Sequence, residues 1–182
     1  MPMKLSKISE ENIICQAINQ VAQKMLIAAK TAPKGRGVDN LEISIVDNIT
    51  IELISNKMRE LGEKWKIDFF IRDADNIMHA PYMVLIGTKI NPLDLDRCGL
   101  CGFRNCDEKR KKVNVPCAFN TGDLGIAIGS AVSVAMDARV DNRIMFSVGK
   151  AVKELELMGE DISIIYGIPL SATAKNPFFD RK

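Results

Sequence analysis

Residues 82–87, Tyr-Met-Val-Leu-Ile-Gly, form a continuous apolar run that is typical of a buried β-strand. Upstream of this run, apolar residues recur every three and four positions from Ile13 to Ala29. This spacing predicts a long amphipathic helix with Ser9 as its N-cap and an end near Thr31. Between the two lies the alternating segment 41–46, Leu-Glu-Ile-Ser-Ile-Val, which predicts a second strand.

The remaining chain continues to alternate between helical and extended patterns. A second helix is expected after the N-cap candidates Asp47 and Asn48, and no periodicity follows the last strand. Alternation of this kind predicts an α/β or α+β fold, and the absence of a linker predicts a single domain over residues 1–182. The other expected elements are strands at 66–72, 143–146 and 161–166, the last ended by 167–169, and helices at 123–138 and 150–157.

Composition excludes several classes of protein. Of 182 residues, 47% are hydrophobic and 26% charged, with a net charge of +2, so no basic surface for nucleic acid is expected. There is no apolar run long enough for a membrane span, and the N-terminal residues lack the apolar core of a signal peptide. We therefore expect a cytoplasmic protein that binds neither nucleic acid nor membrane.

Four of the five cysteines gather in one short stretch. Cys98, Cys101, Cys106 and Cys117 are spaced C-x2-C-x4-C-x10-C. Four thiols this close together in a reducing compartment indicate metal ligation, and the spacing favours a [4Fe-4S] cluster. Cys15 lies far upstream between core positions of the first helix, where packing as a small hydrophobic residue is expected.

The stretch 97–117 is interpreted as an inserted cluster-binding segment between a strand and a helix. Gly99 and Gly102 free the backbone to curl, so that amide groups can point at sulfur. Structural zinc is the main alternative, but a four-cysteine zinc site usually has two C-x-x-C pairs and only one is present. A redox-active thiol pair is the third interpretation.

Charged residues fill the loop between the third and fourth cysteines. The run 107–112, Asp-Glu-Lys-Arg-Lys-Lys, is either a solvated turn or a basic rim beside the cluster. A basic rim would steer an acidic electron-transfer partner of the ferredoxin type.

The sequence resembles two known groups of proteins. The cysteine core is similar to the four-iron motif of small ferredoxin-like domains in electron-transfer subunits and corrinoid proteins. Outside it, the order of several segments resembles the flavin-dependent nitroreductase family, which implies an α+β fold with a three-layer arrangement of sheet and helices. The segments are Ala28–Pro33 with its glycine-rich loop, His79–Pro81 before the buried strand, Asp123–Ala131, the strand at Arg143, Ser147–Gly149, and Ile164–Pro169.

The nitroreductase resemblance implies an FMN site and a homodimer with flavin at its interface. In that family the loop after Ala-Pro touches the flavin, and here it carries Lys34 and Arg36, which could hold the phosphate or be solvated loop residues. Gly149 would either let the backbone approach the flavin or make a turn. Small residues along 123–138 (Gly125, Gly129 and Ser133; Ala127, Ala131 and Ala135) would serve the dimer interface or packing within the chain.

The presence of the cysteine core and the nitroreductase-like segments in one chain resembles an uncharacterised prokaryotic family described as containing a ferredoxin domain. The expected function is an iron–sulfur redox protein that passes single electrons between a cluster and a flavin or a protein partner, as an oxidoreductase. The alternative is a binding or scaffold protein whose metal is structural. No catalytic residue is assigned, because His79 is the single histidine. The acids Asp73, Asp75, Asp94 and Asp96 are interpreted as turn formers.

Overall fold

The apolar run lies in the strand β2, which pairs with a neighbour on each side. Within residues 9–179, the part of the chain that this computed structural model describes, the strands form one antiparallel sheet in the order β1-β2-β4-β3. This confirms the strands predicted at 41–46 and 82–87. The strands are β1 (Leu41–Asp47), β2 (Tyr82–Lys89), β3 (Asp141–Asn142) and β4 (Ile162–Ser171).

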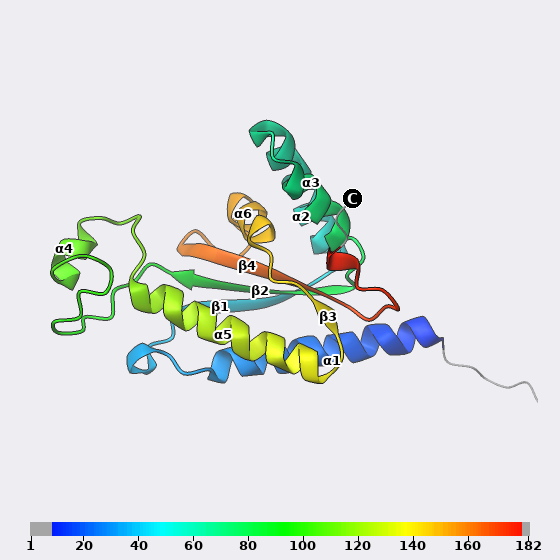
Figure 1. The fold of residues 1–182 in the computed structure, drawn as a ribbon, viewed down its shortest axis with the longest axis horizontal. Helices are drawn as coiled ribbons and strands as arrows, with labels where there is room; N and C mark the ends of the chain where they lie inside the picture. The colour runs from blue at the N-terminus through cyan, green and yellow to red at the C-terminus, as the bar shows by residue number, and fades with distance from the viewer. Residues whose placement is uncertain (1–8, 180–182) are drawn as a thin grey trace, which may run out of the picture.

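Helices cover both faces of the sheet (Figure 1). Alternate side chains of β2 enter two separate cores: Val84 and Ile86 pack with the first helical layer, Met83 and Leu85 with the second. None of the described helices is both long and apolar enough to cross a membrane. The first layer contains α1 (Glu10–Thr31) and α5 (Ala118–Asp137), and the second α2 (Asn48–Trp65), α3 (Asp68–Ile77) and α6 (Phe146–Glu154).

The strands predicted at 66–72 and 143–146 are wrong. Lys66 ends α2 in the left-handed conformation, and α3 starts two residues later with Phe70, Ala74 and Ile77 on its buried side. Their spacing of four and three residues is helical. The strand was predicted because the short apolar run Phe-Phe-Ile is also typical of a strand. Around Arg143 the chain makes only β3 and an isolated bridge from Met145 to Gly167, and the predicted Ser147–Gly149 turn is instead part of α6.

The last strand continues through the residues that were expected to end it. β4 runs to Ser171, and Pro169 pairs with Met83 of β2. Gly167 exchanges hydrogen bonds with Met145 on the β3 side, so Pro169, two residues on, also faces that side. No described strand pairs there between Met145 and Asn142, so the N–H group that proline lacks is not needed.

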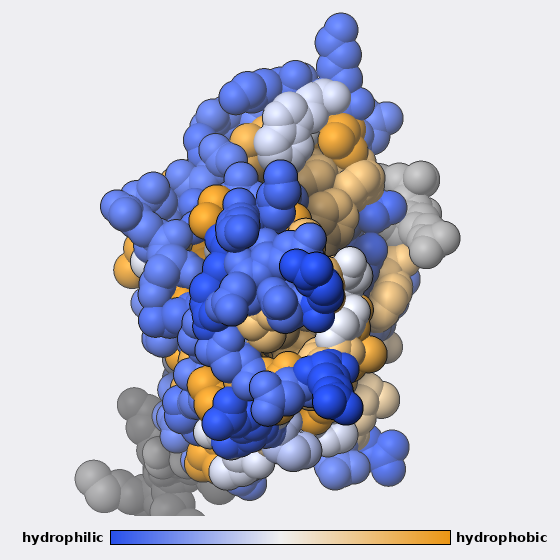
Figure 2. All heavy atoms as spheres, turned by 90° about the vertical axis from the view of Figure 1, so that its left-hand side faces the viewer, coloured by the Kyte–Doolittle hydropathy of each residue, from blue (hydrophilic) through white to orange (hydrophobic). Residues whose placement is uncertain are grey.

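A segment of the chain projects from one end of the sheet between β2 and α5 (Figure 1). It contains the four clustered cysteines and the short helix α4 (Cys106–Arg110). Figure 2 shows that hydrophilic residues cover most of the centre of this end of the molecule, with apolar ones between them. The segment packs little into either core, because of its side chains only Leu93, Lys109 and Cys117 are buried.

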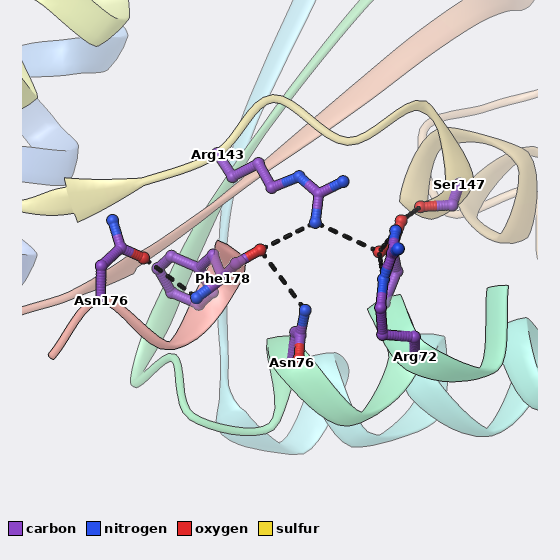
Figure 3. Close-up of polar contacts among 7 residues, drawn as sticks. Arg72, Asn76, Arg143, Ser147, Asn176 and Phe178 are labelled. Atoms are coloured by element: carbon purple, nitrogen blue, oxygen red, sulfur yellow. Dashed lines mark hydrogen bonds and ion pairs between the residues drawn. The ribbon is translucent and has the colours of Figure 1, made fainter. Parts of the chain in front are cut away.

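The C-terminal tail folds back onto α3 through a buried polar network (Figure 3). Phe178, in the short helix η2 (Pro177–Phe179), is fully buried, and its carbonyl accepts hydrogen bonds from Arg143 (2.7 Å) and Asn76 (3.4 Å). Asp73 lies at the centre of the network and accepts from Arg143 (3.3 Å), Arg72 (2.9 Å) and Ser147 (2.7 Å). Asp73 is therefore a buried structural acid in a helix, not a turn former.

Gly149 has a packing function that can be tested. A Cβ atom at this position would lie 1.7 Å from the carbonyl oxygen of Ile165, so α6 can approach β4 only without a side chain there. We expect Gly149→Ala to lower the free energy of unfolding by roughly 1–3 kcal/mol or more. Lys150→Ala, at the exposed next position of α6, is the control and should change the free energy of unfolding by about 0.5 kcal/mol or less in chemical denaturation. Equal stability of the two variants would contradict this packing.

Removal of the charge on Asp73 should be costly. In Asp73→Asn, Arg143 loses its buried anionic partner, and we expect a loss of about 3–5 kcal/mol of stability. The matched control is Asp75→Asn, two residues away in α3, whose half-exposed ion pair with Arg59 should contribute at most about 1 kcal/mol. Urea titrations of both variants would measure the difference, and a loss no larger than in the control would refute the structural importance of Asp73.

Candidate functional site

The cysteine segment is built from tight turns. Gly99 and Gly102 have φ angles of 62° and 84°, a region that favours glycine, and the Gly102 N–H donates to the Gly99 carbonyl at 3.0 Å. The chain therefore curls between Cys98 and Cys101.

The other two cysteines stand at helix starts. Cys106 opens α4, where the Asn105 side chain accepts a hydrogen bond from the Glu108 N–H at 2.9 Å. Cys117 is the N-cap residue of α5 and is buried, whereas the other three clustered cysteines are half-buried. The four thiols thus come from two turns and two helix ends of a single segment.

The four thiols fit an iron–sulfur centre by their chemistry. None forms a disulfide, and each could ligate iron as a thiolate. Among residues 9–179, however, no three Cys, His, Asp or Glu side chains lie close enough together to hold a metal ion. The structure therefore brings the cysteines into one segment without converging them on one point.

The segment is anchored to the sheet by asparagine side chains. The Asn91 N–H donates to Asn120 of α5 at 2.9 Å, and the Asn91 amide donates to Asn40 at 3.2 Å. The amide nitrogens of Asn40 and Asn120 are buried and have no hydrogen-bond acceptor within the described residues. Unpaired buried donors are rare in folded proteins, so the place where the segment joins the sheet is chemically unusual.

Arg36 contacts the cysteine segment, whereas Lys34 contacts the end of α1. Arg36, in the short helix η1 (Gly35–Gly37), donates to the carbonyl of Leu93 at 2.8 Å, and the Gly35 N–H donates to both carboxylate oxygens of Asp123 at 3.1 Å. Lys34 donates to three backbone carbonyls at the end of α1, at 2.7–3.2 Å. Both cations therefore have partners within the chain, which anchor the loop.

Gly149 is not brought together with these two residues. It lies in α6, on the opposite face of the sheet from the loop of Lys34 and Arg36. It borders a shallow pocket of about 140 Å³ that also includes Phe146, Lys150 and Tyr166. Its assignment to a flavin therefore stays a prediction, and its close contact with β4 supplies a packing reason for the glycine.

The charged run 107–112 is divided between the surface and the interior. Arg110 forms ion pairs with Asp94 and Asp107, and the hydrogen bond that it donates to Asp94 raises the pKa of the guanidinium. Lys111 and Lys112 are exposed, as a solvated turn or basic rim requires. Lys109 departs from both interpretations because it is 2% exposed.

A separate cavity of about 720 Å³ lies at the opposite end of β2 from the cysteine segment. Cys15 and His79 line it together with Asn48 and the apolar side chains of Ile14 and Ile18, so Cys15 is half-buried at a cavity wall. The neighbouring Cys15 thiol, followed by desolvation, raises the pKa of Tyr82. The sequence did not predict this hollow, because its walls come from four distant parts of the chain.

Comparison with solved structures identifies the fold. A nitroreductase family protein from Clostridium novyi NT is similar with a TM-score of 0.58 and 12% identity, covering 93% of this chain and 77% of that one. A nitroreductase with bound FMN from Bacteroides fragilis NCTC 9343 gives 0.57 and 12%, covering 97% and 84%. A BluB-like flavoprotein from Clostridium difficile 630 gives 0.51 and 20%, covering 94% and 87%. The predicted nitroreductase-like α+β fold is confirmed.

Comparison of sequences identifies the family. An uncharacterized protein of Archaeoglobus fulgidus is 39% identical over 181 residues, covering 96% of this chain and 97% of that protein. Residues 114–181, which include Cys117, match the family described as "Uncharacterized protein containing a ferredoxin domain (DUF2148)". The chain belongs to this ferredoxin-domain family, and its fold resembles that of the nitroreductase-like flavoproteins.

Proposed function

We propose that this protein is an iron–sulfur redox protein in which Cys98, Cys101, Cys106 and Cys117 hold a [4Fe-4S] cluster. When bound, such a cluster exchanges single electrons, and a flavin would store two of them for a reduction. The turns at Gly99 and Gly102 support ligation by the first cysteine pair, because they make the chain curl between Cys98 and Cys101. Metal binding would draw the thiols together and stabilise the segment, which has few core contacts of its own.

One contact carries the proposal of electron transfer to a flavin. The Arg36 guanidinium donates to the carbonyl of Leu93, so the loop that the nitroreductase resemblance assigns to flavin contact is bonded to the cysteine segment. FMN binds to the fold relative from Bacteroides fragilis, which supports FMN as the flavin here. The exposed Lys111 and Lys112 would then meet an acidic partner of the ferredoxin type, from which single electrons arrive.

A homodimer through α5 is part of the proposal. The alanine stripe Ala127, Ala131 and Ala135 is fully buried within the chain, but added side chains at Gly122, Gly125 and Gly129 would meet open space. Ile126 and Met136 of the same helix are also apolar and exposed. A flat apolar helix face of this kind suits close packing against a second copy.

The cluster is tested by metal analysis of protein purified without oxygen. We expect roughly four irons per chain with matching sulfide and broad absorption near ~400 nm. Single Cys→Ser changes at positions 98, 101, 106 and 117 should each lower the iron content, whereas Cys15→Ser, the matched control, should retain it. A colourless protein with one zinc would refute the redox function and favour a structural metal in a binding module. A flavin count on the same sample tests FMN.

The dimer is tested by sedimentation. Gly125→Arg places a long charged side chain on the open face of α5 and should convert a wild-type dimer into a monomer. Gln23→Arg adds the same charge at an exposed position of α1 and should leave the dimer intact. A monomeric wild-type protein, or a dimer that tolerates Gly125→Arg, would exclude this interface.

A further inference from the structure

Lys109 is a buried cation without an anionic partner. Its side chain is 2% exposed, and across residues 9–179 its ammonium group forms no ion pair or hydrogen bond. Lysine is almost never buried to this extent unless it is paired, because removal of the charge from water is costly. The cysteine segment therefore contains a positive charge that lacks its counter-charge.

The carboxylates of the segment are engaged elsewhere. Between residues 97 and 117 the acids are Asp107 and Glu108. Asp107 pairs with Arg110 at 3.0 Å, and Glu108 accepts from the Arg104 N–H at 2.8 Å. Upstream in the same segment, Asp94 pairs with Arg110 and Asp96 is exposed, so neither is a buried partner of Lys109, and the remaining groups that can become anionic are the cysteine thiols.

Lys109 shares a helix face with one of these thiols. In α4 it follows Cys106 by three residues, and the Lys109 N–H donates to the Asn105 carbonyl at 3.2 Å, which keeps this turn helical. Side chains three apart on a helix are neighbours. A cluster that included Cys106 would therefore form beside the lysine.

A buried side chain with an N–H donor also follows Cys117 by three residues. Asn120 follows Cys117 by three residues in the first turn of α5, is 1% exposed, and has an amide nitrogen without an acceptor. Two cysteines of the motif are thus each followed, one helical turn later, by a buried residue with an N–H donor: Lys109, whose ammonium forms no ion pair among the described residues, and Asn120, whose amide nitrogen is buried without an acceptor. Both observations indicate an anionic group that belongs among these residues.

We propose that Lys109 is the buried counter-charge of the cluster and favours its reduced state. The inference rests on the proposed function, because it requires a cluster on the four cysteines. Reduction adds one electron and hence one negative charge to the cluster, so a fixed positive charge close to it stabilises the reduced form more than the oxidised form. Because the Lys109 side chain is buried, salt screens this effect less than it screens the effect of an exposed charge.

The test compares reduction potentials of loaded full-length variants, measured by titration with dithionite under anaerobic conditions. Lys109→Met keeps the length of the side chain and removes its charge, Lys109→Arg keeps the charge, and Lys111→Met removes an exposed charge from the same run. We expect Lys109→Met to weaken reduction at least tenfold, about 59 mV lower for one electron. Lys109→Arg should stay close to wild type, and any shift in Lys111→Met should disappear at high salt.

If Lys109→Met retains its cluster too poorly for a potential to be measured, the rate of iron loss is measured instead. Iron loss to a chelator should then be faster in Lys109→Met than in Lys111→Met or Lys109→Arg, which supports the same conclusion. Four irons per chain with unchanged potential and unchanged iron loss in Lys109→Met would overturn the function of Lys109 and leave the cluster in place. A wild-type protein without iron would instead refute the proposed function, and the counter-charge with it.

Discussion

Burial of the central strands on both faces is the constraint on which the architecture depends. Residues 83–86 alternate between two apolar cores, so the sheet is stable only with helices on both sides. The connection from β2 to α5 leaves one end of the sheet, where neither helical layer covers it (Figure 1). A segment in this position adds little to either core and can be specialised for ligands without cost to the fold.

Elements with one clear period could be predicted from the sequence, and those with a mixed signal could not. The alternation at 41–46 and the spacing of three and four in α1 each fit a single structure. In contrast, the three apolar residues Phe69, Phe70 and Ile71 suit either a strand or a helix, and the left-handed turn at Lys66 that decides between them has no sequence signal. Pro169 was wrongly expected to end the last strand. A proline interrupts a strand only where its nitrogen faces a paired neighbour, and the sequence does not show which neighbour that is.

The clustering of the four cysteines could be predicted from the sequence, but the surroundings of the segment that carries them could not. The cysteine spacing is a local pattern, so it is visible in sequence. The burial of Lys109 within a run of otherwise exposed charges, and of Asp73 between Arg143 and Ser147, depends on contacts between distant residues. The same holds for the anchoring of the cysteine segment by Asn40 and Asn120, which lie 80 positions apart.

Pro169 has a consequence for how the molecule meets other copies of itself. Beyond the bridge at Gly167, the outer side of β4 offers few unpaired N–H groups, since one position is a proline and the next pairing is with the two residues of β3. A proline and a very short edge strand both make an edge a poor template for a further strand. This part of the β4 edge is thus a poor site for strand addition while the protein folds.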